Sequence, residues 1–190
     1  MVAIRFEQIA IEPGERVILR RVDWSRFEAI LRELGDDRNT RIAYFDEVLE
    51  IMAPLPEHGI NKESLGDLVK ILLEELGLGC IAIGSTTLKK LKQQAGVESD
   101  CCFYIQSCKQ MQGKLAIDLS VDPPPDLAIE IDLTSKTKLD AYLTIDVPEI
   151  WRYDRGNLAI DVLQKGQYTP VSSSSILPNW MPPSRLITFT

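Results

Sequence analysis

Residues 122–133 read DPPPDLAIEIDL, and this segment determines the expected fold. Proline lacks the N–H that a sheet ladder requires, so the strand is expected to start after the three prolines. The apolar run that follows does not alternate with polar residues, which is typical of a strand covered on both faces. We therefore expect this strand to lie inside the sheet that forms the core.

Helices are expected on both sides of this strand. Asp23 or Ser25 can cap a first helix that ends at Gly35. A second, longer helix follows the loop APLPEHG and ends at Gly77. A short third helix is expected in KTKLDAYLTI, residues 136–145. The apolar spacing of the second helix predicts a core-facing stripe of Ile60, Leu65, Leu68, Leu72 and Leu76.

Segments of β type account for much of the remaining chain. RIAYF and VLEIM, within residues 41–52, predict a hairpin, although Glu47 stands in a turn where glycine or asparagine fits better. Further strands are expected in CIAIG, TTLKKL and SDCCFYIQ, and an antiparallel meander in residues 149–172. Helices and hairpins around one mixed central β-sheet define an α/β or α+β class.

The composition is that of an ordinary globular protein, with 45% hydrophobic and 26% charged residues. The chain has 190 residues without an abrupt change in composition, so we expect a single domain over residues 1–190. The net charge of -7 argues against a broad basic surface for nucleic acid, because such binding depends on neutralising phosphates. A local basic rim stays compatible with this charge.

The N-terminal segment and the cysteines predict a cytoplasmic protein. Arg5 and Glu7 interrupt the region where a signal peptide would be apolar. Charged side chains interrupt the most apolar stretch, residues 65–91, so no membrane span is expected. The four cysteines lack C-x-x-C spacing and are expected to be reduced thiols.

The single histidine, His58, limits the mechanisms that the chain can use. A serine or cysteine nucleophile would have to depend on it, and no G-x-S-x-G motif is present. The glycine loops that cradle nucleotide phosphates are also absent from the sequence. We expect His58 to make a hydrogen bond at the start of the long helix, or to support a neighbouring ligand. Carboxylate chemistry remains.

Two carboxylates lie in segments that are expected to be buried. Asp100 begins DCCFYIQ, and Glu130 lies in the middle of DLAIEIDL. An unpaired buried carboxylate is costly, so such residues usually have a cation or a hydrogen-bond donor beside them. On neighbouring strands the two acids could share one ion, and oxygen ligands favour Mg²⁺ or Mn²⁺ over zinc. The alternative is that each acid faces solvent or pairs with a lysine.

Four segments together carry a family resemblance: YFDEVLEIMAPLPEHG, GVESDCCFYI, PPPDLAIEIDLTSK and VPEIWRYD. They resemble the Uma2 family of restriction endonucleases, a branch of the PD-(D/E)xK nuclease superfamily, over residues 24–168. The resemblance implies a restriction endonuclease-like core, in which a mixed sheet is flanked by helices. It also implies that metal-binding acids come together from two adjacent strands.

Within that resemblance, Asp100 matches the acid of the first strand motif and Glu130 matches the acid of the second. Glu63, on the long helix, falls near a position where the superfamily often has a further acid, and is otherwise a solvated helix charge. Asp126 lies too far along the strand from Glu130 to share the ion, so we expect it to hold the loop after the prolines.

The chain departs from the family pattern at two positions. Ser99 replaces the proline that usually precedes the first acid, and this proline binds nothing. Asp132 stands where a fully equipped nuclease has lysine, which removes a local cation. Lys136 or Lys138 could reach back as a substitute, and each is otherwise an ordinary solvated lysine.

Two functions are compatible with these residues. The first is a Mg²⁺-dependent endonuclease that hydrolyses DNA, with Asp100 and Glu130 on the metal and Lys136 assisting. A homodimer would suit cleavage of both strands of a duplex. The second is a catalytically inactive binding or assembly module, because Asp132 has replaced the lysine. In the first case phosphates could also contact Lys89, Lys90 and Lys92.

Overall fold

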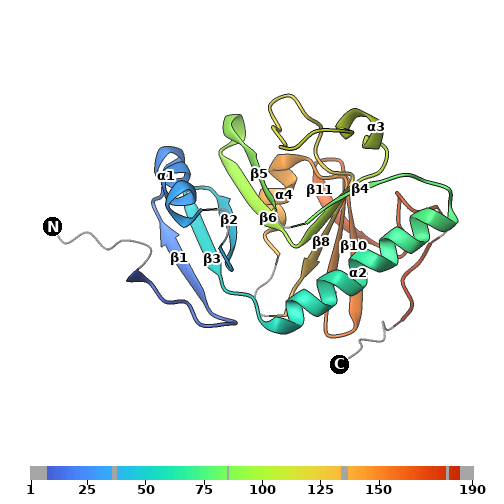
Figure 1. Cartoon of the computed structure of the whole chain (residues 1–190), viewed down its shortest axis with the longest axis horizontal. Helices are drawn as coiled ribbons and strands as arrows, with labels where there is room; N and C mark the ends of the chain where they lie inside the picture. The colour runs from blue at the N-terminus through green and yellow to red at the C-terminus, as the bar shows by residue number, and fades with distance from the viewer. Residues whose placement is uncertain (1–7, 36–37, 85, 134–136, 179, 185–190) are drawn as a thin grey trace.

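The computed structural model describes residues 8–35, 38–84, 86–133, 137–178 and 180–184. The strands and helices of these residues form two β-sheets with helices packed on and between them (Figure 1). In chain order they are β1 Arg16–Arg20, α1 Trp24–Leu34, β2 Arg41–Phe45, β3 Val48–Met52, α2 Pro56–Glu75, β4 Ile81–Ile83, β5 Thr86–Lys90, η2 Leu91–Gln93, β6 Ala95–Ser99, β7 Cys101–Tyr104, α3 Cys108–Met111, β8 Leu127–Ile131, α4 Leu139–Ile145, β9 Glu149–Asp154, β10 Asn157–Gln164 and β11 Gln167–Val171.

The expected α+β class is confirmed, but the strands form two sheets where one central sheet was expected. Sheet A has the order β1-β3-β2-β6-β5, and sheet B has the order β11-β10-β9-β8-β7-β4. In sheet B the β8–β9 pair is parallel, whereas β7–β8 and the meander β9–β10–β11 are antiparallel, so the sheet is mixed. The chain passes from sheet A to sheet B between β6 and β7, at the single residue Asp100.

Helix α1 covers one face of sheet A. The Asp23 side chain caps its first turn by accepting from the Arg26 N–H at 2.8 Å, and Gly35 ends it with a φ of 69°. Phe27 from this helix stacks on Tyr44, with ring centroids 4.3 Å apart. The Phe27 ring also lies against Gly96 of β6, where a Cβ would come within 2.8 Å of its Cζ atom.

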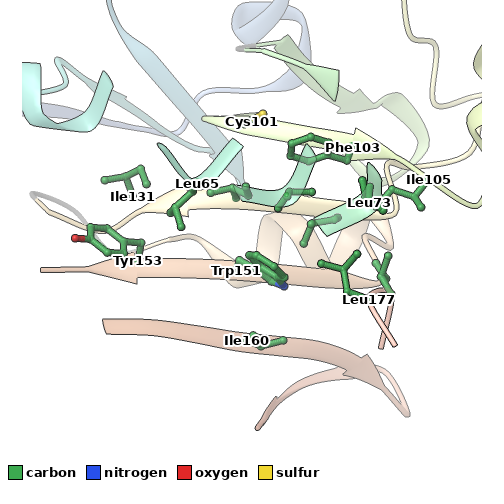
Figure 2. Close-up of a cluster of buried hydrophobic side chains, with 14 residues drawn as sticks. Leu65, Leu73, Cys101, Phe103, Ile105, Ile131, Trp151, Tyr153, Ile160 and Leu177 are labelled. Carbon is green, nitrogen blue, oxygen red and sulfur yellow. The ribbon is translucent and has the colours of Figure 1, made fainter. Parts of the chain in front are cut away.

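Helix α2 covers one face of sheet B, as Figure 1 shows. Its buried stripe consists of Leu65, Val69 and Leu73, which pack on side chains such as Phe103 and Trp151 of the sheet (Figure 2). The expected stripe was partly wrong, because Ile60 and Leu76 are 54% and 44% exposed. The stripe is centred on Val69, and Ile60 lies about 180° around the helix from it, whereas Leu76 is the C-cap residue after α2 has ended.

Helix α4 lies between the two sheets. Its Tyr142 and Ile145 pack with Ala128 and Ile150 of sheet B and with Leu88 and Val97 of sheet A. The other face of sheet B, under α2, carries Trp151 and Tyr153, whereas Ile150 of β9 packs on the α4 side. No described helix is long and apolar enough to cross a membrane.

The expected hairpin is confirmed as β2 and β3, which pair with Phe45 opposite Val48. The two turn residues, Asp46 and Glu47, have φ values of 49° and 57°. Two successive positive φ angles characterise the type I′ turn, whose twist suits a two-residue hairpin. Glu47 therefore adopts a backbone conformation that glycine would adopt without a steric penalty.

Candidate functional site

The register of β7 and β8 brings the two predicted acids together. Cys101 lies opposite Ile129 in this antiparallel pair, and Asp100 and Glu130 are the residues that adjoin these two. Both acids line one cavity, at the end of sheet B that adjoins sheet A.

We call this cavity the acidic pocket. Its volume is about 50 Å³, which is enough for an ion or for a few water molecules. Five carboxylates line it together with two basic side chains, a tyrosine and a threonine. The lining residues are Arg41, Ile42, Ala43, Glu50, Met52, Val97, Glu98, Asp100, Glu130, Ile131, Asp132, Thr137, Lys138 and Tyr142.

Asp100 is held by the backbone of the neighbouring strand and by a guanidinium. Its Oδ2 atom accepts from the Ile131 N–H at 2.9 Å. Its Oδ1 atom lies 3.3 Å from Nε of Arg41, at the start of β2. The Asp100 residue is only 5% exposed. These two contacts fix the carboxylate and partly balance its buried charge.

The surroundings of Glu130 disfavour its charged form. Its carboxylate accepts a hydrogen bond from the Tyr142 hydroxyl, which reaches it from α4. Burial raises the pKa of Glu130 well above its usual value, and the negative charge of Asp100 raises it further. The Tyr142 hydrogen bond and the charge of Arg41 act in the opposite direction on this pKa. A cation between the acids would relieve the repulsion that raises the Glu130 pKa.

Asp132, at the position where lysine is typical of the family, is held by hydrogen bonds and an ion pair. Its Oδ1 atom accepts from the Thr137 N–H at 2.9 Å and from the Thr137 hydroxyl at 2.6 Å. Its Oδ2 atom lies 3.7 Å from a guanidinium nitrogen of Arg152 on β9. Asp132 therefore links the end of β8 to Thr137, just before α4. Lys136, the expected substitute cation, lies outside the described residues.

Lys138, the second candidate for a substitute cation, does line the acidic pocket. Its Nζ atom lies 3.1 Å from Oε2 of Glu50, in the middle of β3. The same Glu50 oxygen is 3.5 Å from a guanidinium nitrogen of Arg16 on β1. Glu50 thus anchors two cations at the mouth of the pocket, where their side chains are both 45% exposed.

Ion pairs that link Arg38, Glu98 and Arg41 support another side of the acidic pocket. Arg41 contacts Glu98 at 3.3 Å as well as Asp100, and Arg38 contacts the other Glu98 oxygen at 2.7 Å. The Arg38 and Glu98 side chains are 9% and 6% exposed. Because both charges of this pair are largely desolvated and mutually satisfied, the pair fixes Arg41 beside Asp100.

His58 lies in the first turn of α2, as expected, and makes a hydrogen bond at the helix start. Its Nδ1 atom accepts from the Leu55 N–H at 3.2 Å, which places the ring proton on Nε2. This Nε2 atom is buried and has no hydrogen-bond partner among the described residues. Burial lowers the pKa of His58, and the charge of Asp100 opposes this effect. His58 does not line the acidic pocket.

Other predicted residues lie away from the pocket. The Glu63 side chain is 69% exposed on α2 and lies 3.6 Å from the Lys62 ammonium, as its alternative reading described. Asp126 was expected to hold the loop after the prolines. It holds the loop after β7 instead, because it accepts from the Ile105 and Ser107 N–H groups. Of the three lysines near β5, Lys89 pairs with Glu28 and Lys90 with Asp146.

The lining residues that were not predicted include Glu50, Glu98, Arg41 and Tyr142. The signal for Glu50 was present, because it stands between apolar residues of a strand in VLEIM, as Glu130 does in LAIEI. No comparable signal exists for Arg41 and Tyr142, which look like ordinary strand-start and helix residues. Their role depends on sheet A and α4 closing over the end of sheet B.

The family comparison agrees with this geometry. A family model described as Uma2, "Putative restriction endonuclease", matches residues 24–187. The chain belongs to the Uma2 family. The match covers the segments that carried the resemblance and extends beyond them to include β11 and the residues after it. In a comparison with curated proteins, none matches this Uma2 chain.

The residues of this Uma2 protein fit a hard divalent cation. Among the described residues, no group of three or more histidine, cysteine or acidic side chains has the geometry of a metal cage. Mg²⁺ does not require one, because it retains several waters and is commonly bound by one or two carboxylates together with substrate phosphates. Asp100 and Glu130, which both line the acidic pocket, are two carboxylates within the same cavity and so fit this kind of donor set.

Proposed function

We propose that this Uma2 protein is a metal-dependent deoxyribonuclease that uses Mg²⁺ or Mn²⁺. The observation that carries the proposal is that Asp100, just before β7, and Glu130, in the neighbouring strand β8, line one cavity. Membership of a family described as restriction endonucleases supports nuclease activity. The acids, the metal and the DNA substrate are the finer parts of the proposal.

Two acids, one tyrosine and two cations among the lining residues take part in the proposed reaction. Asp100 and Glu130 hold the metal, which when bound lowers the pKa of water and polarises a phosphoryl oxygen. Tyr142 orients the Glu130 carboxylate through its hydrogen bond. Arg41 and Lys138 border the same space and supply positive charge for the scissile phosphate. Lys136 stays a candidate for this last part.

The alternative function is a non-catalytic binding or assembly module of the same fold. It is favoured by the commitment of Asp132 to Thr137 and Arg152, which leaves the usual lysine position without a cation. In this version the acidic pocket would be a remnant of an ancestral site, and the acids would serve only the packing of the two sheets.

A plasmid-nicking assay with Mg²⁺ or Mn²⁺ separates the two functions. We expect cleavage by the wild-type chain, and a loss of at least about hundredfold in Asp100→Asn and in Glu130→Gln. Glu63→Gln and Asp67→Asn are matched controls, because both side chains are exposed on α2, and they should keep wild-type activity. Metal-induced thermal stabilisation should disappear in the two pocket variants.

If the wild-type chain shows neither cleavage nor stabilisation by either metal, the nuclease proposal is wrong and the binding module is supported. Two further parts of the proposal need separate measurements. A homodimer, which would suit cleavage of both DNA strands, is tested by the molar mass in solution. A cytoplasmic location is tested by cell fractionation.

A further inference from the structure

The face of sheet A opposite α1 continues outward from the acidic pocket over strands β1, β3 and β2. The registers define which side chains share this face, since opposite residues point the same way. Arg20, Val48 and Phe45 form one row across the three strands. Ile18, Glu50 and Ala43 form the next row, and Arg16, Met52 and Arg41 the third. We call these nine residues the platform.

Part of the platform is exposed although it is apolar. Phe45 is 37% exposed and Ile18 is 41% exposed. Arg16 and Arg20 alternate with Ile18 along β1, and all three are exposed. Exposed apolar and aromatic side chains that are gathered on one sheet face, with cations among them, are characteristic of an interaction surface.

The platform is continuous with the acidic pocket. A groove of about 310 Å³ is lined by Phe45 and Val48, and its other lining residues include Ala43, Glu50 and Lys138, which also line the pocket. A chain segment that places a phosphate in the acidic pocket, beside Arg41 and Lys138, would therefore extend along the groove toward Phe45. The occupant of the groove should be the part of the substrate next to the scissile bond.

The charges around the groove select the kind of substrate. Asp46 and Asp140 line the groove together with Lys138, and Arg16 and Lys138 are already paired with Glu50. With Glu50, three carboxylates line the groove against one ammonium, so the lining is net negative, and the whole chain carries -7. Duplex binding depends mainly on phosphate neutralisation, whereas unpaired bases also gain affinity by stacking on aromatic rings, which does not require net charge.

We propose that the platform binds an unpaired strand of nucleic acid beside the scissile phosphate, with a base stacked on Phe45 and the backbone near Arg20. This inference rests on the proposed nuclease function, because the acidic pocket defines where the strand begins. It adds the substrate class: single-stranded DNA, or an unpaired segment within a duplex.

Binding in EDTA tests the platform without cleavage. The probe is a fluorescein-labelled single-stranded oligonucleotide of mixed sequence, compared by anisotropy with its duplex on the full chain. We expect tighter binding of the single strand, a loss of about tenfold in Phe45→Ala, and near wild-type binding in Phe45→Trp. Arg20→Ala should weaken binding severalfold, whereas the control Arg26→Ala, on the outer surface of α1, should not.

Several results would overturn the platform proposal. These are unchanged binding by Phe45→Ala, a preference for the duplex, or no detectable binding of either probe. If Phe45→Ala instead lowers the molar mass from dimer to monomer, the face is a contact between two copies of the chain. Because EDTA removes the metal, a chain that fails the nicking assay can still pass this test, and the reverse also holds.

Discussion

Glu50 and Glu130 occupy the same kind of position, each an acid between apolar residues of a strand. Their surroundings give them different tasks. Glu50 has two cations within 3.5 Å, so its charge is matched in place. Glu130 faces Asp100 and has only a tyrosine hydroxyl bonded to it among the described residues, so burial and repulsion raise its pKa. Of the two, Glu130 is the residue that gains from a metal ion.

His58 should make stability depend on pH. Its pKa in the folded protein is lowered, so the unfolded chain binds the proton first as the pH falls. The contribution of the neutral His58 ring to the free energy of unfolding should be fully present above pH 6.5 and should be lost as the pH is lowered further. Each pH unit by which the pKa is lowered corresponds to about 1.4 kcal/mol.

The measurement for His58 is urea unfolding at several values between about pH 7.5 and pH 5, compared with His58→Asn. Asparagine at this position can still accept from the Leu55 N–H, but it does not titrate. The difference in unfolding free energy between the two proteins should grow in favour of the variant as the pH falls. A constant difference would mean that the ring titrates normally.

At the scale of single elements, the β2–β3 turn determines how Phe45 is presented. Glu47 has a φ of 57°, a conformation that costs an ordinary residue about 1–2 kcal/mol. Glu47→Gly should therefore raise the free energy of unfolding by about 0.5–1 kcal/mol, after the entropy that glycine adds to the unfolded chain. Glu47→Ala is the matched control and should bring no gain, because it keeps the Cβ atom. Thermal unfolding of the three proteins decides between these outcomes.

The sequence predicted most elements but not their partners. Periodicity and turn residues identified α1, α2, the hairpin and the meander, because these depend on neighbouring residues. The pairing of β2 with β6, through Ala43 and Val97, joins segments on either side of α2, and nothing local specifies it. Asp100 and Glu130 could be predicted as a pair from their own segments and the family motifs. Arg41 could not be placed beside them, because its position depends on the pairing of β2 with β6.

For the whole molecule, net charge and substrate class are linked. A protein with a charge of -7 binds nucleic acid against a general repulsion, so its affinity should come mainly from local contacts. Four cations lie on or beside the platform: Arg16, Arg20, Arg41 and Lys138. Each phosphate neutralised on a single strand contributes about -0.7 to the slope of log K against log salt, so the slope should not exceed about 3 in magnitude.

This prediction is checked by anisotropy titrations of the single-stranded probe between about 50 and 200 mM KCl. In Phe45→Ala the affinity should fall at every salt concentration while the slope stays the same. In Arg20→Ala the slope itself should become shallower. A slope of about 5 or more would instead indicate a broad phosphate-binding surface elsewhere on the chain.

The contact between Phe27 and Gly96 links the far side of sheet A to the chemistry. Gly96 lies in strand β6, which ends at Ser99, and the next residue is Asp100. The depth at which the α1 ring rests on Gly96 thereby sets the path of the strand that delivers the first acid. A substitution in α1 that shifts the Phe27 ring can thus displace Asp100 without any replacement in the acidic pocket. If the chain cleaves DNA as proposed, relatives that differ only behind sheet A should therefore differ in activity.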